Sequence, residues 1–250
     1  MLDNCDRALT CHEWVNGNFT PGTAGQTRSS FFNVASTGWS TTNNGKLNFV
    51  VPIGTEYTDN LNVVGGRPDN KLQLYGTAPI LSPDGIATWY VAADGDPGFG
   101  APIYQQLSGL TPGKQYDVTF YQAAGQQRTF TGPTTERWRV GLDTSILTYG
   151  TIGTQLAKTQ LSKINIFPDT ATRVTDWEKQ TLTFTANSAS DILTFLAVGT
   201  PSGKPPFSLL SSVSVTPTNV PEPLTIIGTI VGGTAALRLR KKLAKSTKNA

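Results

Sequence analysis

Residues 137–142 read RWRVGL, and the alternation in this stretch decides the fold. Every second position carries a large apolar side chain, and the positions between them are arginine, arginine and glycine. Successive side chains of a β-strand point to opposite faces, so this period of two predicts a strand with one buried face. Similar runs, separated by Gly, Pro, Asn and Asp, occupy residues 46–51, 71–75, 116–121, 181–185 and 212–216. Repeated short strands with such turn residues predict an antiparallel β-sandwich.

Two other stretches of the body depart from this alternation. Residues 192–198 read ILTFLAV and are apolar on both faces, which predicts a central strand. Residues 154–163 are expected to form one short helix.

The composition is typical of an exported, β-rich protein. Only 15% of the 250 residues are charged, whereas Gly (25) and Pro (16) are frequent. Charge this sparse argues against a coiled coil and against a basic nucleic-acid binder, so we expect no nucleic-acid partner. One His and two Cys leave almost nothing for a His/Cys metal site. Cys5 and Cys11 either close a small disulfide loop in an oxidising compartment or remain two thiols.

The net charge of +3 is unevenly distributed along the chain. Six of the 20 basic residues lie in the last 13 positions, and the rest of the chain has 14 basic against 17 acidic residues. Before this cluster, residues 223–237 carry no charge and would span roughly 22 Å as a helix. A buried core helix is one interpretation. We favour a single transmembrane helix whose basic end stays in the cytoplasm, formed by Arg238, Arg240, Lys241 and Lys242.

Pro221, Glu222 and Pro223 precede this apolar stretch. A Pro-Glu-Pro motif, an apolar span and a terminal basic cluster together resemble the PEP-CTERM sorting signal of bacterial exosortase substrates. The resemblance implies an exosortase-type membrane protease as partner, a transient membrane anchor, and delivery to the cell surface or extracellular matrix. Such proteins also carry a signal peptide, but no apolar segment occurs before Trp14. We therefore expect an in-frame signal peptide upstream of Met1.

The body is similar to galactose-binding-like jelly rolls, in residues 15–20, 109–116 and 207–215. In such domains the closing strand commonly reads Leu-Asp-Asn-Val, whereas Ser211 and Ser212 replace Asp and Asn here. The resemblance implies an all-β fold, namely a single antiparallel jelly-roll-like β-sandwich. The expected organisation is a disordered segment (1–13), the β-sandwich domain (14–216), a Pro-rich linker (217–223) and the sorting anchor with its basic tail (224–245).

Asp94 and Asp96 flank a glycine and precede Pro97-Gly98. Two carboxylates on such a turn can converge on calcium, which would stiffen the loop. The alternative is an ordinary polar turn in which aspartate accepts hydrogen bonds from backbone amides. No other cofactor is predicted.

Aromatic side chains on the surface could stack against sugars, and Trp39 and Tyr75 are the candidate platforms. Their alternative is burial in the core. The leading functional hypothesis is a non-enzymatic surface or matrix protein, and the second is a carbohydrate-binding module for envelope glycans or exopolysaccharide. The third, a glycan-active enzyme, would need a pair of facing carboxylates, drawn from Asp94, Asp96, Glu136 and Asp176.

Overall fold

The structure is a computed structural model, and everything below concerns the residues that it describes. These are residues 17–19, 38–42, 47–53, 61–62, 71–72, 74–75, 82–87, 89–128, 130–169 and 173–218.

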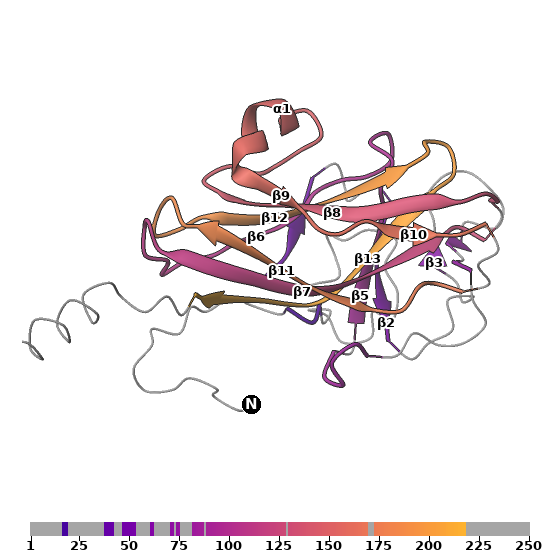
Figure 1. Cartoon of the computed structure of the whole chain (residues 1–250), viewed down its shortest axis with the longest axis horizontal. Coiled ribbons are helices and arrows are strands. Elements are labelled where there is room, and N and C mark those ends of the chain that lie inside the picture. The colour runs from indigo at the N-terminus through magenta and orange to yellow at the C-terminus, as the bar shows by residue number, and fades with distance from the viewer. Residues whose placement is uncertain are drawn as a thin grey trace, which may run out of the picture. The chain divides into compact units, whose positions relative to one another are not determined.

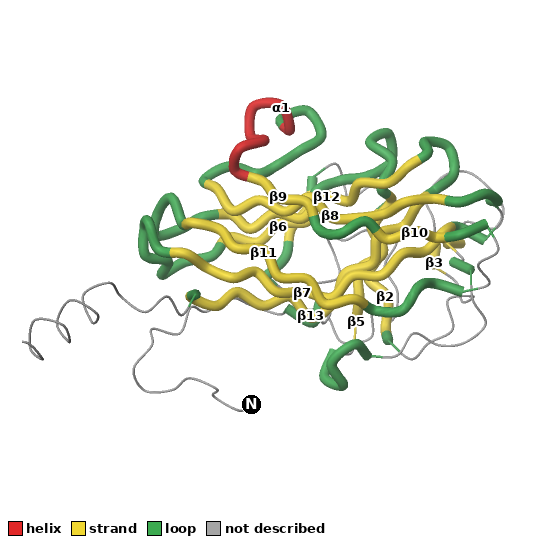
Figure 2. Tube along the Cα trace, in the orientation of Figure 1, coloured by secondary structure: helices red, strands yellow, loops and turns green. Residues whose placement is uncertain are grey.

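Two antiparallel sheets face one another in this part of the chain (Figures 1 and 2). Sheet A contains, in spatial order, β11 (Glu178–Thr185), β7 (Gln115–Gln126), β13 (Pro206–Pro217), β5 (Trp89–Asp94) and β2 (Asn48–Pro52). Sheet B contains β1 (Ser40–Thr41), β6 (Ile103–Gln106), β12 (Ile192–Thr200), β8 (Thr134–Asp143) and β10 (Asn165–Phe167), and β9 (Thr159–Leu161) also pairs with β8. A separate two-stranded sheet joins β3 (Leu61–Asn62) to β4 (Lys71–Leu72). The prediction of a mostly β protein with antiparallel strands is confirmed.

The main core lies between the two sheets and follows the period of two. On β8, Trp138, Val140 and Leu142 point inward and are buried. Phe120 on sheet A and Phe195 on β12 meet edge to face, with ring centroids 5.1 Å apart. β12 lies between β6 and β8, as expected for a central strand with two apolar faces. Alternation along the sequence therefore predicted which side chains enter this core.

A second apolar cluster covers the opposite face of sheet A. Tyr90, Phe207 and Leu209 point to this side, where Leu74 and Val174 also pack. Asn48 and Val50 on β2 point away from this cluster and are buried as well. Both faces of this strand are therefore buried. Segments that are distant in the sequence cover this part of sheet A, which the alternation of β2 alone did not indicate.

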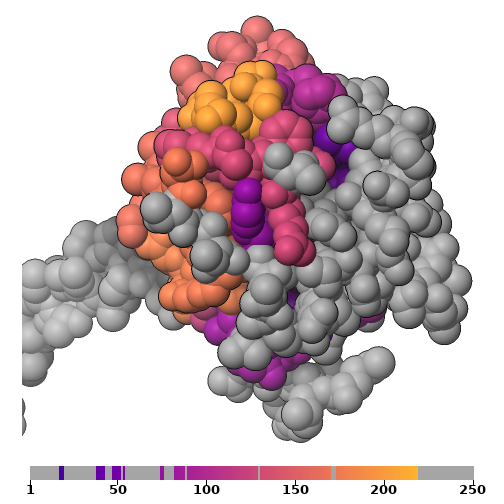
Figure 3. Space-filling view, turned by 90° about the vertical axis from the view of Figure 1, so that its right-hand side faces the viewer, coloured from indigo at the N-terminus to yellow at the C-terminus, as the bar shows by residue number. Residues whose placement is uncertain are grey.

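At one end of the sandwich, the start of the β5–β6 connection touches the end of β12 and the start of β13 backbone to backbone. The N–H of Gly199 donates to the carbonyl of Gly95 (3.0 Å), and the N–H of Gly95 donates to the carbonyl of Pro206 (2.8 Å). A Cβ on Gly95 would lie 2.4 Å from the nitrogen of Gly199, so only glycine permits this approach. Figure 3 views this end, with the orange-yellow β12–β13 connection beside the purple β5–β6 connection.

The single α-helix of the described residues is α1 (Ile152–Gln155), which continues as a 3₁₀ turn at Leu156–Lys158. The expected helix over 154–163 is therefore wrong in extent. Residues 159–161 form β9 instead, because they hydrogen-bond along β8.

By its internal contacts the chain divides into two units, residues 1–217 and 218–250. Within the described residues, no helix has the length and apolar character needed to cross a bilayer. The predicted anchor (224–245) lies outside those residues, as does the predicted N-terminal segment (1–13).

Candidate functional site

The face of sheet B that points away from sheet A is called the outer face here. On β8 it carries Arg137, Arg139, Gly141 and Asp143, since the residues between them point into the core. Residues opposite one another in register share a face. The outer face therefore also includes Thr194, Leu196 and Val198 on β12, Thr159 and Leu161 on β9, and Ile166 on β10.

The β8–β9 connection crosses this face, and α1 lies above it (Figure 1). The N–H of Leu147 donates to Oγ1 of Thr194 (3.4 Å), and the hydroxyl of Tyr149 donates to the carbonyl of Ala197 (2.5 Å). Oγ1 of Thr151 accepts from the N–H of Thr148 (2.9 Å) and donates to Oε1 of Gln155 (2.8 Å). These hydrogen bonds hold the short helix over the sheet and orient the Gln155 side chain.

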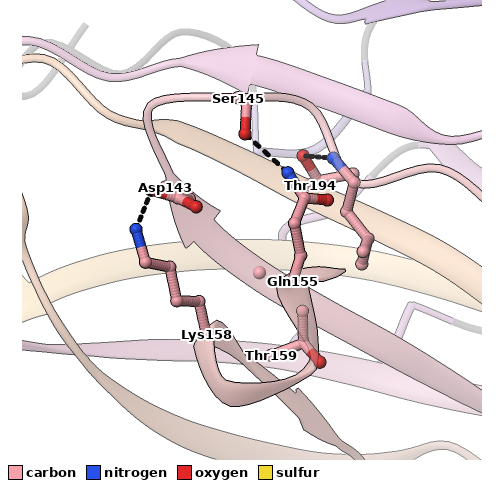
Figure 4. A pocket seen from close by; sticks show the side chains of 8 residues that line it. Asp143, Ser145, Gln155, Lys158, Thr159 and Thr194 are labelled. Atoms are coloured by element: carbon pink, nitrogen blue, oxygen red, sulfur yellow. Dashed lines mark hydrogen bonds and ion pairs between the residues drawn. The ribbon is translucent and has the colours of Figure 1, made fainter. Parts of the chain in front are cut away.

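A pocket opens between α1 and the sheet (Figure 4), and it is called the α1 pocket below. It is a shallow, solvent-open depression whose enclosed space is no larger than about one water molecule. Strands β8, β9 and β12 form its floor, and the β8–β9 connection forms its wall. The lining residues are Gly141, Asp143, Ser145, Leu147, Gln155, Lys158, Thr159 and Thr194.

Six of the eight lining residues have hydrogen-bonding side chains, although carbon atoms make up most of the exposed lining. Oδ1 of Asp143 accepts from Nζ of Lys158 (2.8 Å), the N–H of Thr144 (2.7 Å) and Nδ2 of Asn187 (3.3 Å). Among the described residues no donor hydrogen-bonds to Oδ2 of Asp143, which remains an acceptor. Nε2 of Gln155 donates to Oγ of Ser145 (2.5 Å). The pocket thus offers a carboxylate, an ammonium, an amide and hydroxyls within one small space.

Sequence reasoning did not identify this pocket. Continuing the alternation of residues 137–142 by one position would have placed Asp143 on the outer face. No local signal places Ser145, Gln155 and Lys158 beside it, because the path of the β8–β9 connection brings them there.

Asp94 and Asp96 lie on one turn, where backbone and hydroxyl donors occupy three of their four carboxylate oxygens. Oδ1 of Asp94 accepts from the N–H of Asp96, whose own oxygens accept from Gly98, Ser202 and Gly203. The hydrogen bond from the Ser202 hydroxyl is the main reason that the pKa of Asp96 is lowered. These contacts are those of the polar-turn alternative.

No set of three or more His, Cys, Asp or Glu side chains suited to a metal occurs among the described residues. Calcium binding by Asp94 and Asp96 stays a prediction. Oδ2 of Asp94 is buried without a partner and is the one carboxylate oxygen of the pair left for a cation.

Two of the carboxylates considered for catalysis are closed to solvent. Burial raises the pKa of Asp94 to about 7 and the pKa of Glu136 to about 8. Their exposed fractions are 0% and 1%, so neither faces a cleft from which a substrate could reach it. Asp176 lies on the surface, where it pairs with Arg173 (2.8 Å).

The two predicted aromatic platforms contribute to packing. Trp39 is 5% exposed and packs against Phe19 and Phe195, so its expected role as an exposed platform is wrong. Tyr75 is half-buried; its ring centroid lies 5.8 Å from that of Phe167, and its hydroxyl donates to the carbonyl of Phe130 (2.6 Å). The structure does not bring the two rings into contact with one another.

The predicted sorting motif and basic stop lie outside the described residues. They comprise Pro221, Glu222, Pro223, Arg238, Arg240, Lys241 and Lys242.

Comparisons with known proteins yield structural likeness only. No protein-family model matches the chain, and no curated protein matches it. Similar solved structures include a CBM4 module, at 17% identity over 81% of this chain and 98% of that one, with a TM-score of 0.33. They also include the CBM22-1 xylan-binding domain of Paenibacillus barcinonensis Xyn10C (8% identity, 73% and 87% covered, TM-score 0.33) and the K1 cleaved adhesin domain of Lys-gingipain from Porphyromonas gingivalis (14%, 73% and 92%, TM-score 0.34). At such values the likeness assigns neither a ligand nor a site to this chain.

Proposed function

We propose that the β-sandwich is a non-enzymatic carbohydrate-binding module and that its ligand lies on the outer face of sheet B. The observation that carries this proposal is the α1 pocket, a solvent-open space on a sheet face that is lined mainly by hydrogen-bonding side chains. Binding sites for small ligands combine an apolar surface with a few placed polar groups.

A sugar matches the chemistry of this pocket. Each hydroxyl of a sugar both donates and accepts hydrogen bonds, and Oδ2 of Asp143 supplies an acceptor while Nζ of Lys158 supplies donors. The aliphatic parts of the lining side chains provide apolar contacts for the C–H groups of the ring. The pocket is too small to enclose a sugar, so it would hydrogen-bond the edge of one sugar residue in a longer chain that lies across the sheet face.

Removing a polar group from this pocket should weaken glycan binding. We expect Asp143→Asn and Gln155→Ala to raise the dissociation constant by about tenfold each, because each removes hydrogen bonds to the ligand. The measurement is a glycan array with the full chain, followed by calorimetric titration with the glycans that bind.

Thr181→Ala is the matched control for this experiment, because Thr181 is an exposed residue on β11 in the other sheet. It should bind as the unaltered chain does. Absence of binding to any glycan, or equal affinities of all three variants and the parent, would rule out the proposed function.

We further propose that the module is exported and delivered to the cell surface through its C-terminal residues. The order of Pro221–Pro223, an uncharged stretch and a basic cluster supports this proposal. In a host that contains an exosortase, mass spectrometry of the surface form should find a C-terminus near Pro221–Pro223. Recovery of the intact chain through Ala250 at the surface would contradict it.

A further inference from the structure

Arg137 and Arg139 lie next to one another on the outer face, two positions apart on β8. Positions i and i+2 of a strand are separated by roughly 6.8 Å, and both side chains point to the same side. Both residues are half-buried. Arg139 is also connected to the α1 pocket, since its Nη1 donates to Oγ1 of the pocket residue Thr159 (3.1 Å).

Neither arginine has a negative partner in the described part of the chain. The ion pairs there join Lys158 to Asp143, Lys163 to Glu178 and Arg173 to Asp176. Glu136 stands between Thr135 and Arg137 on β8, but its side chain points into the core and away from the arginines. Asp143, the acidic residue of the outer face on β8, is already paired with Lys158.

The described part of the chain therefore supplies no counter-charge to these two cations. Burial and the neighbouring positive charge of Arg137 lower the pKa of Arg139. The Nε of Arg139 is buried and has no hydrogen-bond partner. An anion beside the pair would supply the missing charge, and carboxylates bind guanidinium groups through two parallel hydrogen bonds.

Aliphatic side chains flank the two arginines. Val198 lies opposite Arg137 in register, and Leu161 lies opposite Arg139 on the other side. Ile166, on the neighbouring strand β10, is 63% exposed. This strip therefore combines two cations with apolar surface for the C–H faces of sugar rings.

We infer that the outer face binds an acidic polysaccharide, with Arg137 and Arg139 contacting the carboxylates of uronic acid residues while the rim of the α1 pocket contacts a neighbouring sugar. This inference rests on the proposed function and adds the class of ligand to it. The charge of the body favours local recognition over general attraction, because outside the last 13 residues acidic side chains outnumber basic ones.

The test compares polymers that differ only in charge. Polygalacturonate, alginate and hyaluronate are each titrated against the full chain in parallel with their methyl esters, which have the same backbone without the carboxylate charge. For at least one pair we expect the acid to bind ten times or more tightly than the ester at low salt. The ratio should approach one in 0.5 M NaCl, because ions screen exposed charges.

Substitutions distinguish a preference for the acid that comes from the arginine pair from one that comes from the basic tail. Arg137→Gln should remove most of the preference for the acid, and Arg137→Lys should retain only part of it, because lysine keeps the charge but not the planar guanidinium fork. Lys179→Gln, at an exposed position on β11, is the control and should keep the full preference. Thermal unfolding followed by circular dichroism checks that each variant is folded.

Three results would overturn the inference. They are equal binding of acid and ester in every pair, binding of neither polymer in any pair, and a preference for the acid that survives Arg137→Gln, which would point to the tail cations. If neutral glycans on the array still bind through the α1 pocket, the proposed function stands without this inference. If no glycan binds at all, both fail.

Discussion

Raising the pH from 5 to 8 should destabilise this protein by about 3–4 kcal/mol through Glu136 alone, and Glu136→Gln should remove that loss. The side chain is 1% exposed, and burial raises the pKa of Glu136 from its ordinary value of 4.5 to about 8 in the folded state. Between these values the folded protein keeps a proton that the unfolded chain has released, so stability falls as the pH rises. Each unit of pH in this window changes the free energy of unfolding by about 1.4 kcal/mol.

Urea unfolding at intervals from pH 5 to 9 measures this effect. Asp94 also lowers the free energy of unfolding as the pH rises. Its pKa is about 7, so its effect is complete at a lower pH than that of Glu136. The change above pH 7 therefore belongs mainly to Glu136, and the curve of Glu136→Gln should flatten there. Asp176→Asn is the control, since Asp176 is exposed and ionised throughout this range. Parallel curves for the parent and Glu136→Gln would refute the prediction.

Trp138→Ala should lower the free energy of unfolding by about 3–5 kcal/mol, as expected for a large aromatic side chain removed from a packed core. Trp138 is fully buried, and its ring meets Phe195 edge to face at 5.9 Å between centroids. Its Nε1 donates to the carbonyl of Leu209 (3.0 Å), a hydrogen bond that joins sheet B to sheet A. The substitution removes both the packing and this link between the sheets.

Urea denaturation at pH 6 provides the measurement for Trp138. Trp138→Phe keeps a ring but loses the N–H, so we expect a smaller loss than with alanine. Leu156→Ala, at a site that is 54% exposed, should change stability by less than about 0.5 kcal/mol. A loss below about 1 kcal/mol for Trp138→Ala would contradict the central place of this side chain in the core.

The order of polar and apolar residues predicted the strands and their inward faces. Trp138, Val140 and Leu142 are buried as the period of two required, and the arginines between them point outward. These predictions succeed because the alternation of side chains is a local property of extended backbone. The same alternation already placed Arg137 and Arg139 on one face.

Other predictions from sequence failed where distant segments meet. Trp39 lies in a polar stretch of the chain, yet Phe19 and Phe195 enclose it. Residues 159–161 were expected to be helical, but they pair with β8 as the strand β9. In both cases long-range contacts outweigh the local composition.

The sequence by itself determined that this chain forms antiparallel strands and which side chains of each strand face the same way. Only the tertiary structure decided which of those faces are covered. It placed a second cluster on sheet A, laid the β8–β9 connection across sheet B, and left Arg137 and Arg139 beside the α1 pocket. The physical reason is that side-chain direction follows from the geometry of neighbouring residues, whereas covering a face depends on segments that lie far apart in the sequence.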